Sequence, residues 1–231
     1  FGHTLLRIDA AGQTEATRLL AYTINYAAKA DATDGFTFAL KGLTGLYPGT
    51  LSSSPYYAKV REYSDMESRD VWEYRLNLTP DETRQLLRHA WEIGATRFDY
   101  WFFDENCSYH LLALLDAARP GLNLTDDFTW KAIPIDTVRA VTRTPGLLKA
   151  IHYRPSNSTE LRYRAALIGP TRTALAKKVA TGDMLPADLA GSEPDPAMRA
   201  RMLEVAERYM AYDATQRSLG DAYVQTQRMR R

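Results

Sequence analysis

The sequence predicts an α+β fold in which an antiparallel sheet packs against the helix that carries the only cysteine of the chain. Three observations indicate this class. Residues 3–103 form short apolar segments separated by Gly, Pro and Ser, which is typical of strands. Two helices are indicated at 79–94 and 104–118. Beyond about residue 150 the pattern is helical, so we expect a domain over 1–155 and a helical appendage over 156–231 that leads to a downstream region.

Composition excludes several classes of protein. The 231 residues carry a net charge of +1 and are 45% hydrophobic, which is ordinary for a globular chain. A charge near zero provides no field to attract nucleic acid, so no nucleic-acid partner is expected. One cysteine cannot form an internal disulfide or a cysteine-rich zinc site. The apolar runs are far shorter than the roughly 20 residues that span a bilayer.

Five strands are expected between residues 3 and 103. The first two form a long antiparallel hairpin around a loop that contains Gly12, and the fourth alternates apolar and polar residues with period two. The four predicted strands are His3 to Asp9, Arg18 to Tyr26, Phe36 to Leu40 and Val71 to Leu78, and a fifth aromatic strand is expected at Arg97 to Phe103.

The helix that follows the fourth strand has clear start and stop signals. Thr79 is a typical N-cap, Pro80 suits the first helical position, and Glu82 completes a capping box. Gly94 provides the stop. The next helix is expected to be capped by Asp104 and to end before a Pro-Gly pair.

The appendage is expected to contain two capped helices and a heptad pattern. The helices are predicted at Ser156 to Ile168 and Thr171 to Ala180. Apolar or aromatic residues then recur with alternate spacings of four and three, at Met198, Met202, Val205, Tyr209, Tyr212, Leu219 and Tyr223. This seam either packs on the domain or on the appendage's own helical hairpin, or it docks to a neighbouring domain or a second chain.

The only cysteine, Cys107, is predicted in the first turn of the helix that follows the last strand. Helix N–H groups and the helix dipole favour a thiolate at such a position, and the same groups stabilise an oxyanion. We therefore place Asn106 and Ser108 beside the thiol as oxyanion residues. The alternative is that Cys107 is a buried small hydrophobic residue, which free cysteines usually are.

A nucleophilic cysteine needs a base and a group that orients the base. His110 lies on the same helix, and His89 falls on the capped helix as a solvated residue. His3 opens the first strand, and a strand-mounted His that faces a helix-mounted Cys is the arrangement of papain-like thiol enzymes. We therefore predict His3 as the base.

The predicted hairpin also suggests the orienting group. If Asp9 pairs with Arg18, residue 3 falls opposite residue 24, and Asn25 lies within one position of His3. Asn25 is therefore the predicted third residue, although a register slip of one residue would turn it to the other face. Tyr26 and Glu73 are the fallback candidates.

A metal-binding alternative would use Asp104, Cys107 and His110, which are spaced three apart on one helical face. Asp104 is already explained as an N-cap, and no second ligand cluster exists. No metal or cofactor is therefore expected.

Aromatic residues gather in one part of the chain. Fourteen of the 25 lie between Phe36 and Phe103. They form either an aromatic core or a wide apolar cleft for acyl chains or a membrane-proximal substrate. Tyr56, Tyr57 and Glu73 are the candidates for lining this cleft.

Several motifs taken together resemble the Lnb N-terminal periplasmic domain family. They are Phe1-Gly2-His3-Thr4, the aromatic segments Tyr56 to Tyr63 and Arg69 to Tyr74, and Phe102-Phe103-Asp104-Glu105-Asn106-Cys107-Ser108-Tyr109. The resemblance covers about residues 1–155. It implies a circularly permuted papain-like fold, with Cys107 as nucleophile and His3 as base, and a periplasmic or cell-envelope location. The family is named after a lipoprotein intramolecular transacylase, so a lipid or lipoprotein acyl substrate and proximity to a membrane are implied.

These observations favour a thiol-dependent acyltransferase or hydrolase of the cell envelope that works through an acyl-thioenzyme. A cysteine peptidase or amidase acting on peptidoglycan or peptides is the second hypothesis. The third is a non-enzymatic interaction module with a docking helical tail, and it predicts that His3 and Cys107 lie apart.

Overall fold

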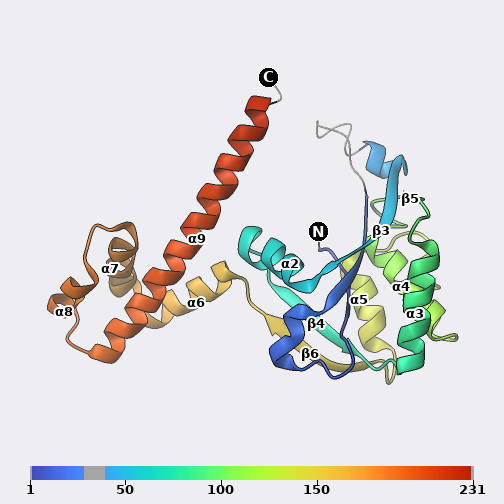
Figure 1. The fold of residues 1–231 in the computed structure, drawn as a ribbon, viewed down its shortest axis with the longest axis horizontal. Helices are drawn as coiled ribbons and strands as arrows, with labels where there is room; N and C mark the ends of the chain where they lie inside the picture. The colour runs from blue at the N-terminus through green and yellow to red at the C-terminus, as the bar shows by residue number, and fades with distance from the viewer. Residues whose placement is uncertain (1, 29–39, 230–231) are drawn as a thin grey trace. The chain divides into compact units, whose positions relative to one another are not determined.

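The computed structural model describes residues 2–28 and 40–229, with side chains described as far as Ser218. It is a mixed α+β structure with antiparallel sheets, which confirms the predicted class (Figure 1). One sheet has four strands in the order β1-β2-β3-β5, and the other pairs β4 with β6. The strands are β1 (Leu6–Ile8), β2 (Tyr22–Ala28), β3 (Tyr47–Pro55), β4 (Val71–Leu76), β5 (Phe98–Tyr100) and β6 (Leu148–Arg154).

The N-terminal hairpin forms, but with a different register from the predicted one. Leu6 pairs with Ile24 and Ile8 with Tyr22, so the paired residue numbers sum to 30 instead of 27. The predicted pairing of Asp9 with Arg18 is wrong because residues Glu15–Leu20 form a 3-10 helix, η1, within the connection. The second strand therefore begins four residues later than expected. His3 lies outside β1.

Three helices follow in the same N-terminal part of the chain that forms the four-stranded sheet. They are α3 (Pro80–Ile93), α4 (Cys107–Ala118) and α5 (Pro134–Arg143). The capping box of Thr79 and Glu82 forms as predicted and starts α3. Helix α4 contacts α3, α5 and β2, and is apolar on nearly every side because it is enclosed by these elements. Its leucines form the centre of the core, which contains Ile24, Leu86, Leu111, Leu112, Leu114, Leu115, Ala118, Leu124, Phe128, Ala132, Val141 and Leu147.

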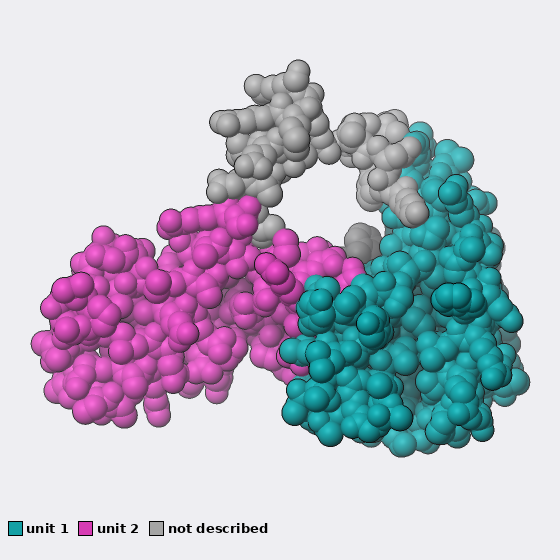
Figure 2. All heavy atoms as spheres, viewed as in Figure 1, with its two compact units in different colours: residues 1–58, 74–152 teal, residues 59–73, 153–231 magenta. Residues whose placement is uncertain are grey.

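The chain forms two compact units, which Figure 2 shows in different colours. Unit 1 contains residues 1–58 and 74–152, and unit 2 contains residues 59–73 and 153–231. Unit 2 is therefore built from two separate stretches of sequence. The predicted division at residue 155 stays a prediction.

Unit 2 is mainly helical. Its helices are α6 (Asn157–Ile168), α7 (Pro170–Thr181), the 3-10 helix η3 (Pro186–Asp188), α8 (Leu189–Ser192) and α9 (Pro196–Met229). The short helix α2 (Tyr56–Val60) leads into a π-helix, η2 (Arg61–Met66). Met202 and Val205 of the predicted seam are fully buried in a core with residues of α6, α7 and α8. The part of the seam at Met202 and Val205 therefore packs within the appendage, and docking of the remaining seam residues stays a prediction.

Two further predictions concern the strands and membrane helices. Nearly all of the strand predicted at Phe36 to Leu40 lies outside the described residues, and Leu40 itself belongs to a helical turn. Over residues 2–28 and 40–229, none of the helices is long and apolar enough to cross a membrane.

Candidate active site

Helix α4 begins at Cys107, and Asn106 is its N-cap. The Asn106 Oδ1 atom accepts hydrogen bonds from the backbone N–H groups of Ser108, at 3.0 Å, and Tyr109, at 3.4 Å. The prediction of Asp104 as N-cap is therefore wrong by two residues. The correction moves Cys107 to the first position of the helix, where the dipole favours an anion. The residue is 4% exposed.

The Asn106 side chain also fixes the loop in front of the helix. Its Nδ2 atom donates to the backbone carbonyls of Ala132, at 2.6 Å, and Phe102, at 3.1 Å. A further bond joins the Ala132 N–H to the Phe103 carbonyl at 2.8 Å. The residue before the cysteine is thus anchored to segments on both sides of α4.

His3 forms a hydrogen bond with the Cys107 thiol. Burial of the thiol raises its pKa, but the hydrogen bond and the charge of His3 lower it, as do the Thr4 backbone N–H and the Tyr100 hydroxyl. The lowering effects prevail, so the pKa of the Cys107 thiol lies below its usual value of 9. A buried cysteine with a lowered pKa is unlike the inert buried cysteine that is the common case.

The second nitrogen of His3 is held by Asn25, a buried residue of β2. His3 Nε2 lies 2.5 Å from Asn25 Oδ1. Because an amide oxygen only accepts, Nε2 carries the proton and Nδ1 is left to accept the proton of the thiol. The structure therefore brings Cys107, His3 and Asn25 together in one chain of contacts. Their roles in a reaction stay predictions.

Sequence reasoning missed Tyr100, the last residue of β5. Its hydroxyl oxygen accepts a hydrogen bond from the Cys107 backbone N–H at 3.3 Å, and its O–H donates to the Cys107 sulfur. Burial and the nearby Cys107 charge raise the pKa of Tyr100, so its hydroxyl stays protonated. A tyrosine at the end of the strand before the cysteine helix was the available signal.

Tyr26, a fallback for the orienting group, occupies a different position. Its ring stacks on Tyr100 with 5.5 Å between centroids and lies 4.0 Å from the His110 ring. Its buried hydroxyl has no hydrogen-bond partner among the described residues. Burial lowers the pKa of His110 to about 4, so this imidazole is neutral near pH 7. Both residues belong to an aromatic core beneath the site.

Asn106 and Ser108 are predicted as oxyanion residues, and this role stays a prediction. Both amide hydrogens of Asn106 go to backbone carbonyls. The Ser108 hydroxyl donates to Asn106 Oδ1 at 2.7 Å, and its backbone N–H has the same acceptor. The Ser108 hydrogens therefore serve the helix cap, whereas the Asn106 amide hydrogens bind the Phe102 and Ala132 carbonyls.

The three residues predicted to line a cleft have different surroundings. Tyr56 is buried, with the Arg7 guanidinium 5.2 Å from its ring centroid, whereas Tyr57 is exposed. Tyr56 therefore belongs to the interior and not to a rim. Glu73 lies in unit 2, where its carboxylate is 3.6 Å from Arg154.

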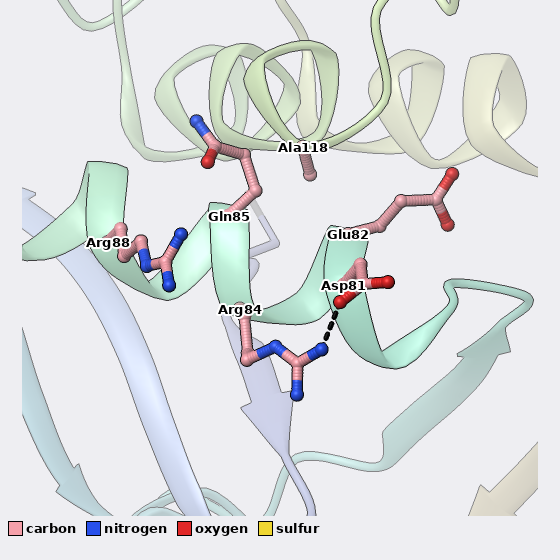
Figure 3. A pocket seen from close by; sticks show the side chains of 6 residues that line it. All are labelled: Asp81, Glu82, Arg84, Gln85, Arg88 and Ala118. Carbon is pink, nitrogen blue, oxygen red and sulfur yellow. Dashed lines mark hydrogen bonds and ion pairs between the residues drawn. The ribbon is translucent and has the colours of Figure 1, made fainter.

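A pocket of about 640 Å³ lies between α3 and α4 and does not include Cys107. Figure 3 shows charged side chains of α3 around it, with Arg84 paired to Asp81. Its lining residues are Asp81, Glu82, Arg84, Gln85, Arg88 and Ala118. This open, mixed-charge pocket has no nucleophile, so it does not carry the predicted chemistry.

Within the part of the chain that the structure describes, no three or more His, Cys, Asp or Glu side chains are grouped to hold a metal ion. His110, one member of the metal-binding alternative, packs against the rings of Tyr26 and Phe98.

Unit 1 is thus an α+β domain in which a buried cysteine at a helix N-terminus contacts a histidine that is hydrogen-bonded to an asparagine. Residues 1–144 match the Lnb N-terminal periplasmic domain family, and because this match covers more than half of the chain, the chain belongs to that family. The domain is therefore periplasmic, with a role associated with the cell envelope. Residues 151–231 match a domain of unknown function, DUF7842. No match was found among curated proteins or among solved structures.

Proposed function

We propose that this chain is a cell-envelope acyltransferase or hydrolase that works through an acyl-thioenzyme on Cys107. The observation that carries the proposal is the contact of a low-pKa thiol with His3, whose other nitrogen is held by Asn25. A nucleophile, a base and a group that orients the base are the three parts that this chemistry requires. The third hypothesis, an interaction module, expects His3 to lie away from Cys107, so the contact favours the enzyme.

In the proposed reaction, Nδ1 of His3 takes the thiol proton and the sulfur attacks the carbonyl carbon of an ester or amide. The carbon–sulfur bond forms while the carbonyl electron pair moves to oxygen. The tetrahedral intermediate collapses, the bond to the leaving group breaks, and His3 returns its proton to that group. An amine or water then attacks the thioester and releases Cys107, with His3 again accepting and returning a proton.

The order of the parts in the chain supports a circularly permuted papain-like arrangement. In unit 1 the base His3 precedes the nucleophile, and the nucleophile opens a buried helix that packs on the sheet. Fold alone does not define a reaction, so the permuted fold and the acyl chemistry are separate parts of the proposal.

Exposed aromatic side chains favour a lipid acyl group over a peptide as substrate. Trp101 and Phe103 precede the cysteine helix, and Trp130 is 89% exposed. The loop of Phe103 and the segment after Trp130 are joined by the backbone bond from Ala132 N–H to Phe103 O. Large exposed aromatics are suited to contact acyl chains or a bilayer interface.

The test is to trap the acyl intermediate. The 231-residue chain is incubated with 4-nitrophenyl octanoate, with a diacylated lipopeptide and with a peptidoglycan stem peptide, and is weighed intact by mass spectrometry. We expect one acyl group on the wild-type chain from the ester and the lipopeptide, and none on Cys107→Ala. An adduct that persists in Cys107→Ala, or its absence from the wild type with every acyl donor, would refute the proposal. Cleavage of the stem peptide without lipopeptide acylation would select the peptidase or amidase.

A further inference from the structure

The hydroxyl of Tyr100 occupies a special position beside the nucleophile. It accepts the Cys107 N–H at 3.3 Å and donates its own hydrogen to the Cys107 sulfur. We propose that Tyr100 is a catalytic residue whose hydroxyl, together with the Cys107 N–H, binds the oxyanion that forms during acyl transfer. This inference rests on the proposed acyl-transfer function and adds the group that stabilises its transition state.

The movement of charge during the reaction explains why one hydroxyl can donate first to the thiolate and then to the oxyanion. Before attack the negative charge is on the sulfur, where the Tyr100 O–H donates to it. When the carbon–sulfur bond forms, the charge moves to the carbonyl oxygen, which is bonded to the same carbon. The oxygen is thus only two covalent bonds from the sulfur, and the donor can follow the charge. A donor that is in place before the charge moves needs little reorganisation, which is how oxyanion sites act.

The other hydrogen-bond donors described next to Cys107 already have acceptors. The Ser108 and Tyr109 N–H groups point to Asn106 Oδ1, and the Asn106 amide hydrogens go to backbone carbonyls. The Cys107 N–H, by contrast, is paired only with the Tyr100 oxygen among the bonds described for it. If the oxyanion replaces the Tyr100 oxygen as acceptor of that N–H, the same two groups form a two-donor site.

The surroundings of Tyr100 keep it neutral and fixed. Its ring stacks on Tyr26 and meets the edge of Phe102 at 6.0 Å between centroids. Burial and the adjacent thiolate both raise the pKa of Tyr100, which keeps the hydrogen on its oxygen at neutral pH. The hydroxyl therefore donates a hydrogen bond throughout and transfers no proton.

The test compares two reactions of the same sulfur in Tyr100→Phe. Alkylation by iodoacetamide occurs at a saturated carbon and creates no oxyanion, whereas acylation by 4-nitrophenyl octanoate does create one. Both rates are measured as a function of pH up to the plateau, where the thiol is fully ionised. Tyr26→Phe is the matched control, because it removes a buried hydroxyl from the stacked neighbouring ring and that hydroxyl has no partner among the described residues.

We expect Tyr100→Phe to lower the acylation plateau about 100- to 1,000-fold, the usual effect of removing one oxyanion donor. Its alkylation plateau should stay within about threefold of the wild type, which also shows that the variant folds. Tyr26→Phe should keep both plateaus. If Tyr100→Phe lowers the acylation and alkylation plateaus equally, or lowers neither, the inference is overturned. The proposed function still stands in that case, provided that the wild type forms the Cys107 adduct. Absence of acylation in the wild type would instead refute the proposed function, and the inference with it.

Discussion

Two opposing effects act on the thiol of Cys107. Burial alone would raise its pKa and make it an inert core residue, whereas the contact with His3, the Thr4 N–H and the Tyr100 hydroxyl lower it. The balance depends most on His3, the source of the largest lowering effect. Cysteine reactivity at this position is thus a property of the contacts of the thiol and not of its exposure.

Replacing His3 should reverse this balance. In His3→Gln the effect of burial remains and the main stabiliser of the thiolate is lost, so the thiol pKa should rise. Each unit of increase reduces the thiolate fraction below the pKa about tenfold. The rate of alkylation by iodoacetamide, followed from pH 5 to 10, should show its midpoint shifted upward. His89→Gln, at a half-exposed residue of α3, is the control and should leave the midpoint in place. An unchanged midpoint in His3→Gln would show that His3 does not set the thiol pKa.

Gly49 shows why the aromatic core beneath the site is sensitive to size. A Cβ at this position would overlap the Tyr26 ring, which cannot retreat because it packs on Tyr100 and His110. We expect Gly49→Ala to lower the free energy of unfolding by about 1–3 kcal/mol, as overpacking does. Urea denaturation provides the measurement. Gly191→Ala is the control, since a Cβ there meets no atom within 4 Å, and it should be nearly neutral. A neutral Gly49→Ala would mean that the ring stack is loose.

The residues of the candidate site were predictable to different degrees. Cys107 and His3 stand out by residue type and position, but Asn25 was predicted from a hairpin register that is wrong by three residues. Asn25 still meets His3 because His3 lies beyond the end of β1, where the ladder does not fix its direction. Tyr100 was missed because its role depends on a bond between its hydroxyl and a backbone N–H, and a sequence pattern does not show such a bond.

Local signals predicted helices well where a single cap residue was available. The Thr79 capping box and the Ser156 cap both form as predicted. Before α4, however, Asp104 and Asn106 are both good caps, and local preference does not separate them. Tertiary bonds decide the choice, because only the Asn106 amide also binds the Ala132 and Phe102 carbonyls.

This double role makes Asn106 more important than an ordinary cap. Asn106→Ala removes the cap and leaves the Ala132 carbonyl without the amide donor, so we expect a loss of about 2–4 kcal/mol in the free energy of unfolding. Thr79→Ala, which removes the corresponding cap of α3, should cost only about 1 kcal/mol. Thermal or urea denaturation of both variants checks the difference. Equal losses would show that the bonds to Ala132 and Phe102 add nothing to stability.

The two compact units do not follow the order of the chain. Residues 59–73 lie in the sequence between the two stretches that form unit 1, but they belong to unit 2 together with the C-terminal helices. Specific bonds explain this assignment: Asp70 accepts from the Ser156 N–H and the Tyr153 hydroxyl, and Asp65 accepts from the Asn157 amide. Helix α9 also contacts η2. The sequence predicts one boundary near residue 155, because composition along the chain does not show that two distant segments pair.

A chain that ends at residue 155 should therefore be affected within residues 59–73. Truncation removes Ser156, Asn157 and α9. The Asp65 and Asp70 carboxylates therefore lose hydrogen-bond donors, and η2 loses the helix that contacts it. Hydrogen exchange followed by mass spectrometry should show loss of protection at residues 61–70, because protection depends on such local packing. Peptides from α4, whose core neighbours all lie in unit 1, should keep their protection and serve as the internal control. If 61–70 stays protected in the truncated chain, this segment folds without the C-terminal helices, and a division near residue 155 would describe the protein better than the discontinuous one.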